Sequence, residues 1–369
     1  MTLADLGASV LKIERPGTGD TVREAAPRYE AGGRSESVYF CNVNRNKGSL
    51  ALDLKSGTDR AELLRRVADV DVVVESFRPG TADRLGIGYD ALRAVNPRIV
   101  YCAITGYGQT GDLAGVAGHD LNIAGMSGML QMHEGQVPQM PNVLMADYAG
   151  STAAIAAILA GIIAARATGT GSFVDVSMLD ALSSWSSVHM TQVFAARGSG
   201  DAGRVEGWGG NPRYNIYRAR DGRYLTVSLL ERDLWARCCR AFGREDLVNP
   251  AETEADRLTA HGTRSDDYRR FLAELIASDD RDRWAERFRD LGLPICPVYT
   301  PEEWFASKQA AQRDCFQTQP LPALGIEIPQ LGFPFHMRMA DGSNAFALRA
   351  SPPLLDSARV GGAPIPDAP

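Results

Sequence analysis

Four titratable side chains in glycine-interrupted parts of this chain could together perform acid/base chemistry. His119 and Asp120 follow Gly118, Asp147 stands shortly before a long apolar run, and Glu231 follows a strand pattern that begins near residue 222. Imidazole and carboxyl groups are the side chains that most often give and take protons in enzymes. Their types and polar surroundings therefore indicate proton transfer rather than ligand storage.

Each of these four side chains also has a structural interpretation. His119 could be a hydrogen-bonded loop histidine, and Asp120 could bind loop amides. Asp147 could cap the apolar helix that follows it, because an aspartate at that place accepts hydrogen bonds from helix amides. Glu231 could complement the dipole of a helix that begins near Arg232. At the level of the residues, both interpretations remain open.

Composition restricts the class of protein. The chain has 369 residues, and 44% of them are hydrophobic, which is enough for a sizeable core and suggests two domains. Its net charge of -6 argues against a nucleic-acid partner, because general binding of that kind needs clustered cationic charge. We therefore expect a globular enzyme with small-molecule partners.

Cysteine usage and hydropathy indicate a compartment. The six cysteines show no CxxC pair and no zinc-ligand spacing, which is typical of reduced thiols, so we expect no metal. The longest apolar stretch, 153–165, is too short to span a bilayer, and we recognise no signal peptide before it. These features predict a cytoplasmic protein without a membrane partner.

Strand and helix patterns alternate in the N-terminal half, as they do around a parallel sheet. Apolar, β-like runs cover 9–14, 70–74, 99–104 and 173–177, and helical patterns cover 59–68 and 148–167. Glycines between 106 and 118 mark a long loop after the third run, a place where such sheets often carry function. The predicted fold class is α/β, with a large Rossmann-like parallel-sheet domain.

A smaller α+β domain is expected to follow. The large domain is predicted over 1–197, a glycine-rich linker over 198–210, the small domain over 211–315, and a segment returning to the large domain over 316–369. Asp221-Gly222 between two strand patterns predicts a hairpin. Helical patterns cover 179–194, 232–242, 265–276 and 281–291.

Six motifs carry a resemblance to a known family. They are DLGASVLKIERP at 5–16, NRNK at 44–47, LDLK at 52–55, ESFRPG at 75–80, TGYGQTG at 105–111 and VDVSM at 174–178. In this order they resemble the family III CoA-transferase superfamily of the CaiB/BaiF type. The resemblance implies an interlaced homodimer and an enzyme that acts on acyl-CoA thioesters without a prosthetic group.

The superfamily contains two kinds of enzyme, and the resemblance gives the acid/base group a role in each. In the racemase branch, the groups matching His119 and Asp147 flank the carbon beside the thioester, while those matching Glu231 and Asp120 support them. Transferases often carry tyrosine at the position of His119 and use the aspartate matching Asp147 as a nucleophile. We therefore expect an alpha-methylacyl-CoA racemase, with a CoA-transferase as the alternative and an inactive CoA-binding protein as a third possibility.

The same motifs imply a binding site for the CoA moiety. Arginine and lysine suit the 3'-phosphate and the diphosphate of CoA. The predicted CoA-side residues are Arg45, Lys47, Leu54, Lys55, Arg78, Arg84 and Gly118.

The acyl group is harder to predict. A short dicarboxylate would need a further cation, which Arg213 or Arg232 could supply. A branched or steroid chain would instead need an apolar surface, for which the methionines at 126, 129, 132, 140 and 145 are candidates. Family members usually begin with a strand and a loop before the helix that leads into residues 6–8, so we also expect that the first strand of the sheet is missing here.

Overall fold

The chain folds into two compact units. The computed structural model describes residues 1–130, 140–199, 210–336 and 340. One unit comprises Met1–Ser187 and Lys308–Pro369, and the other comprises Val188–Ser307, so the second unit is inserted within the first. The sequence prediction placed these junctions at 197 and 315. The single helix expected over 179–194 is two helices, α8 (Met178–Trp185) and α9 (Ser187–Ser199).

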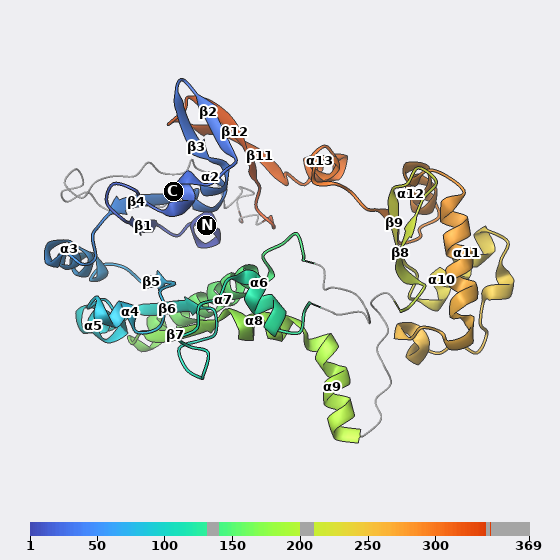
Figure 1. Ribbon diagram of the computed structural model, residues 1–369, viewed down its shortest axis with the longest axis horizontal. Helices are drawn as coiled ribbons and strands as arrows, with labels where there is room; N and C mark the ends of the chain where they lie inside the picture. Colours follow the sequence, from blue (N-terminus) through green and yellow to red (C-terminus); the bar gives the residue numbers. More distant parts are fainter. Residues whose placement is uncertain (131–139, 200–209, 337–339, 341–369) are drawn as a thin grey trace. The chain divides into compact units, whose positions relative to one another are not determined.

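Parallel strands form the centre of the first unit (Figure 1). Strands β5 (Val72–Glu75), β6 (Val100–Thr105) and β7 (Ser172–Ser177) pair in the order β5-β6-β7, and β1 (Val10–Glu14) pairs with β4 (Lys47–Ala51). This confirms the predicted α/β class. Among the described residues, however, the strands form two separate parallel sheets rather than one.

Helices bury both faces of the three-stranded sheet. On one face, Tyr101 and Ala103 of β6 pack against α3 (Gly57–Val67) and α5 (Tyr89–Val95), in a cluster that includes Val67 and Leu92. On the other face, Cys102 packs against α7 (Met145–Thr168). This alternation along β6 is the two-residue repeat of a strand covered on both sides.

Helix α7 lies close to the sheet and carries an unusually apolar surface. A Cβ atom at Gly161 would lie 2.8 Å from a methyl group of Val100, so glycine permits the close approach. By length and composition, α7 could cross a membrane. The sequence prediction considered only the apolar stretch 153–165, which is too short to do so. Only 33% of the most apolar 18-residue stretch of α7 is buried, and the exposed side of the helix includes Leu159 and Ile163.

A returning segment completes the first unit. The hairpin of β11 (Phe316–Leu321) and β12 (Ile326–Leu331) lies beside the hairpin of β2 (Arg28–Ala31) and β3 (Arg34–Ser37) and beside α2 (Val38–Asn44) (Figure 1). Their shared cluster consists of the buried residues Cys41, Leu321, Leu324 and Ile328.

The shorter helices of the first unit are α1 (Thr2–Asp5), α4 (Thr81–Arg84), α6 (Asp120–Met126) and α14 (Lys308–Gln312). A further short helix, α13 (Pro301–Phe305), belongs to the second unit.

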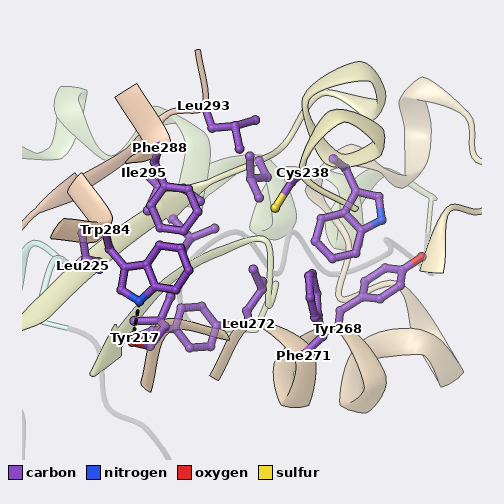
Figure 2. Packing of buried hydrophobic residues seen from close by; sticks show 14 of the residues in the cluster. Tyr217, Leu225, Cys238, Tyr268, Phe271, Leu272, Trp284, Phe288, Leu293 and Ile295 are labelled. Atoms are coloured by element: carbon purple, nitrogen blue, oxygen red, sulfur yellow. Dashed lines mark hydrogen bonds between the residues drawn. The ribbon is translucent and has the colours of Figure 1, made fainter. Parts of the chain in front are cut away.

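The second unit has an antiparallel sheet covered by helices. Its strands are β8 (Tyr214–Arg218), β9 (Tyr224–Ser228) and β10 (Ile295–Pro297), and its main helices are α10 (Arg232–Ala241), α11 (Ser265–Ala277) and α12 (Arg281–Asp290). The hairpin predicted at Asp221-Gly222 is confirmed, since Gly222 turns with a φ of 83° between β8 and β9. Figure 2 shows the core, in which Trp284 and Phe288 stack with ring centres 5.0 Å apart.

Candidate active site

Three of the predicted acid/base residues come together where α6 and α7 begin. His119 immediately precedes α6, and its backbone N–H donates a hydrogen bond to Oδ1 of Asn122 at 3.0 Å. Asp120 is the first residue of α6, and its Oδ1 accepts hydrogen bonds from the backbone N–H groups of Ala146 at 2.6 Å and Asp147 at 3.1 Å. Asp120 therefore joins the start of one helix to the start of the other.

Apolar packing fixes this junction from behind. Ile123 and Ala124 of α6, Ala146 and Ala149 of α7, and Leu182 of α8 form one buried cluster. Asp120 is 9% exposed, whereas His119 and Asp147 are exposed. The cluster thus holds the backbone while the two side chains that could transfer protons face outward.

The electrostatic surroundings favour the neutral form of Asp147. Partial burial raises the pKa of this carboxyl group, and the nearby charge of Asp120 raises it further, while His119 opposes the rise. Two neighbouring carboxylates resist joint ionisation. Asp147 therefore holds a proton more readily than an ordinary aspartate, which a group that acts as both acid and base requires.

The glycine before His119 has a packing reason. A Cβ atom on Gly118 would lie 2.6 Å from the phenol oxygen of Tyr107, so any larger residue would displace the ring or the loop. Glycine at this position lets the Tyr107 ring pack against the loop just before His119. Gly118 thereby positions His119, and its predicted contact with CoA stays a prediction.

Glu231 belongs to the other unit. It precedes α10 and forms an ion pair with Arg257, a short contact between the carboxylate and the guanidinium. Its carboxylate thus has a partner inside its own unit. The predicted support of His119 by Glu231 would join the two units and stays a prediction.

Arg45 and Arg213 are both buried and paired with carboxylates. Arg45 is 1% exposed, and its Nε and Nη2 donate to the carboxylate of Asp5 at 2.8 to 3.2 Å. Arg213 is fully buried, and its Nη1 donates to both oxygens of Glu252 at 2.7 and 2.9 Å. Both guanidinium groups are thus paired with a carboxylate inside the fold, and the predicted contact of Arg45 with CoA stays a prediction.

The other predicted CoA-side cations have different settings. Lys47 donates to Oδ1 of Asn44 at 2.7 Å, and burial lowers the pKa of its ammonium group. Lys55, Arg78 and Arg84 are exposed. Lys55 and Arg78 follow the carboxyl ends of β4 and β5, which is where open α/β sheets bind ligands.

The methionines divide into two groups. Met129 and Met145 pack against the apolar cluster behind the junction. Met126 and Met140 are 54% and 71% exposed, so they remain candidates for an acyl-chain surface. Met132 lies outside the described residues. Arg232 is exposed, and its Nη2 donates to the backbone oxygen of Pro250.

Two residues of structural importance were absent from the sequence predictions. Asn122 holds the backbone of His119, and its position three residues later is the spacing of a helix-capping pair, which could have identified it. Glu14 gathers Arg23, Ser49 and the backbone of Asp20 around its carboxylate. No local spacing indicates that cluster, because Ser49 lies 35 residues from Glu14.

No group of three or more histidine, cysteine, aspartate or glutamate side chains suited to hold a metal ion occurs in the described parts of the chain.

Comparisons with known proteins place the chain among acyl-CoA enzymes. It is 31% identical over 336 residues to human succinyl-CoA:glutarate CoA-transferase, covering 89% of this chain and 74% of that protein. It is also 29% identical to human alpha-methylacyl-CoA racemase, covering 86% and 78% of the two chains. The crystal structure of a CAIB/BAIF family protein from Brucella suis matches with a TM-score of 0.77 and 29% identity, covering 96% and 90%.

The match extends to the level of a defined family. Residues 1–357 match CoA-transferase family III, and the two human relatives named above are enzymes. This agrees with the motifs found in the sequence and with the two-unit α/β architecture. The chain belongs to CoA-transferase family III and is an enzyme.

Proposed function

We propose that this protein is an acyl-CoA racemase that inverts the carbon beside the thioester. The observation that carries the proposal is the junction of α6 and α7, where Asp120, the residue after His119, accepts a hydrogen bond from the backbone of Asp147, a carboxyl group with a raised pKa. A two-base mechanism requires one group that starts as a base and another that starts as an acid.

The proposed reaction moves one proton off the carbon and another onto it. Neutral His119 or ionised Asp147 removes the alpha proton, and the electron pair of the C–H bond enters the thioester to form an enolate. The other group, protonated at the start, delivers its proton to the opposite face. Each positioned acid/base group typically contributes on the order of 10² to 10⁴-fold to the rate. Glu231 is proposed to orient His119, and Asp120 positions Asp147.

The CoA moiety is the part of the substrate shared by all reactions of the family. We propose that Lys47, Lys55, Arg78 and Arg84 contact its phosphates, with the backbone near Leu54 and Gly118 completing the site. Lys55, Arg78 and Arg84 are exposed and therefore accessible. The proposed chemistry needs no prosthetic group, because the thioester itself makes the alpha proton acidic.

The working form is proposed to be a homodimer. Support comes from α7, whose outward side carries Ile163 at 70% exposure and Leu159 at 41%, and from Trp185 of α8 at 50%. Exposed apolar side chains of this size on one unit are typical of an interaction surface.

A second candidate function is CoA transfer between carboxylic acids. It is favoured by the relatives, since transferases from human and from Acetobacter aceti match at 31% and 30% identity. In this reaction the Asp147 carboxylate would attack the thioester carbonyl and expel CoA thiolate, giving an anhydride. The thiolate would then attack the aspartyl carbonyl, releasing the first acid and leaving an enzyme-bound thioester.

One experiment separates the two candidates. The protein is incubated with (S)-2-methylacyl-CoA in deuterated water, and exchange of the alpha proton is followed by NMR for the wild type, His119→Ala and the control His336→Ala. We expect exchange that His119→Ala abolishes and His336→Ala retains. Absence of exchange, together with trapping of an Asp147 acyl species by hydroxylamine, would replace the racemase with the transferase. Absence of both alpha-proton exchange and a trapped acyl species would contradict both enzyme proposals.

A further inference from the structure

A buried hydroxyl group at the carboxyl end of β6 has no partner in the fold. Thr105 is 7% exposed, and its Oγ1 is buried without a hydrogen bond to any described residue. A buried polar group without a hydrogen bond costs free energy, which is why nearly all such groups in folded proteins are paired. Threonine at this position therefore calls for an explanation other than core packing.

The backbone just after Thr105 lies against the wall of the candidate active site, while the Thr105 side chain is on the face of β6 that also carries Ala103. The next residue, Gly106, accepts a hydrogen bond from the backbone of Leu179 at 3.0 Å, and a Cβ atom on it would lie 3.3 Å from Ile123. Ile123 belongs to the apolar cluster that supports the junction of α6 and α7. The strand end that carries Thr105 thus adjoins the wall of the site, at the edge where open parallel sheets bind ligands.

The neighbours on the same face of the sheet restrict the chemistry of a ligand. Ala103, two residues before Thr105, stands in register with Glu75 on one side and Asp175 on the other. Residues in register on parallel strands point to the same face, so two carboxyl groups accompany the hydroxyl. Such a setting disfavours a phosphate and favours a neutral group that carries N–H donors, such as an amide.

We propose that Thr105 hydrogen-bonds an amide of the pantetheine arm of the CoA thioester. The inference rests on the proposed function, because it assumes a CoA thioester at this edge. Pantetheine is the neutral part of CoA between the diphosphate and the thioester, and it contains two amide groups. Thr105 is then a substrate-positioning residue that lies outside the acid/base group.

The chain contains a matched control. Ser172, the first residue of β7, also has a buried Oγ without a hydrogen bond to any described residue. It stands at the opposite, amino end of the same sheet, since β6 and β7 run parallel. If unpaired hydroxyls were only a feature of the packing, both positions would respond alike.

The test measures binding of CoA and of adenosine 3',5'-bisphosphate, which lacks pantetheine, by calorimetry. Thr105→Val removes the hydroxyl at nearly constant shape and is expected to weaken CoA binding by about 3- to 10-fold, the usual value of one hydrogen bond. Binding of the bisphosphate should not change. Thr105→Ser should bind CoA within about twofold of the wild type, and Ser172→Ala should bind both ligands normally.

Several outcomes would overturn the inference. Wild-type CoA affinity in Thr105→Val would do so, as would an equal weakening of both ligands, which would indicate a damaged site. A loss in Ser172→Ala equal to that in Thr105→Val would point to packing alone. Failure of the wild type itself to bind CoA would overturn the proposed function together with this inference.

Discussion

At the scale of single residues, the proposed chemistry depends on how Asp120 holds the start of α7 and how its charge affects the pKa of Asp147. One carboxylate oxygen of Asp120 accepts two backbone hydrogen bonds at the start of α7, and its charge helps to raise the pKa of Asp147. The first contribution is mechanical and the second is electrostatic. They can be separated, because an asparagine keeps the acceptor oxygen but removes the charge.

We expect Asp120→Asn to shift the pH dependence of alpha-proton exchange to lower pH. Burial is the largest cause of the raised pKa of Asp147, and the Asp120 charge adds to it, so neutralising that charge lowers the pKa. The limb of the kcat/KM profile that reports ionisation of Asp147 should move accordingly. An unshifted limb would contradict the electrostatic role.

Asp120→Ala serves as the comparison because it removes both contributions. Loss of the hydrogen bonds at the start of α7 should destabilise the protein by about 1 kcal/mol in urea denaturation. Asp120→Asn should lose less. Equal destabilisation by the two substitutions would show that the asparagine does not reproduce the hydrogen bonds.

At the scale of elements, buried charges anchor strands and loops. Glu14 ends β1, and its carboxylate accepts from Nε and Nη2 of Arg23 at 2.8 Å, from the backbone of Asp20 at 2.8 Å, and from Ser49 of β4 at 2.5 Å. Burial alone would raise the pKa of Glu14, but these hydrogen bonds outweigh it and lower the value from 4.5 to about 2. The loop after β1 is thus fixed by one side chain.

This anchor predicts a pH-dependent stability. A depressed pKa means that the stabilisation is complete above pH 4.5 and is lost as the pH falls toward 2. Glu14→Gln should therefore lower the free energy of unfolding at pH 7 by on the order of 2 to 3 kcal/mol. The difference from the wild type should shrink as the pH falls toward 3. A difference that is constant with pH in denaturant titrations would rule out the linkage.

The buried pair of Arg213 and Glu252 predicts an asymmetric response in the second unit. Glu252→Ala leaves an uncompensated buried cation and should destabilise the protein by about 3 to 5 kcal/mol. The double substitution Arg213→Met with Glu252→Leu removes both charges and should cost less than Glu252→Ala alone. Urea denaturation monitored by tryptophan fluorescence would measure both values. A double variant less stable than the single variant would reverse this interpretation.

The same elements show how far the sequence alone leads. Strands such as β6 and the hairpin at Gly222 could be predicted because apolar runs and turn residues are local signals. The break at Ser186 between α8 and α9 could not, since neither glycine nor proline marks it. The pairing of Arg45 with Asp5 could not be predicted either, because the two residues lie 40 positions apart in the chain.

The features of the candidate site also divide into those that a local pattern predicts and those that depend on the folded structure. Local motifs predict His119, Asp120 and Asp147 as site residues, and Asp120 accepts hydrogen bonds from the backbone of Ala146 and Asp147. Their long-range connections, such as the proposed one from Glu231, depend on the arrangement of units, which no local pattern encodes. That the Thr105 hydroxyl is buried without a partner among the described residues is likewise visible only in the folded structure.

At the scale of the whole molecule, the outward side of α7 predicts an oligomer. Ile163→Glu should convert the proposed dimer to a monomer, because it places a charge among apolar side chains that a second copy would cover. Light scattering after size-exclusion chromatography would measure the mass. Val95→Glu is the control, since Val95 is an apolar residue on α5 with 41% exposure. A wild type that is monomeric, or an Ile163→Glu variant that stays dimeric, would contradict the proposal.

The insertion of one unit within the other sets an order of events during synthesis on the ribosome. The core of Val188–Ser307 comes from one continuous stretch, so it can condense as soon as that stretch has left the exit tunnel. The first unit cannot be completed until residues 308–369 have also been translated. Cys41 and Arg45 meet Leu321 and Leu331 only after the inserted unit has been made. The β2–β3 hairpin and α2 are therefore translated early but gain their partner hairpin late, and the apolar side chains of their shared cluster remain uncovered in the interval.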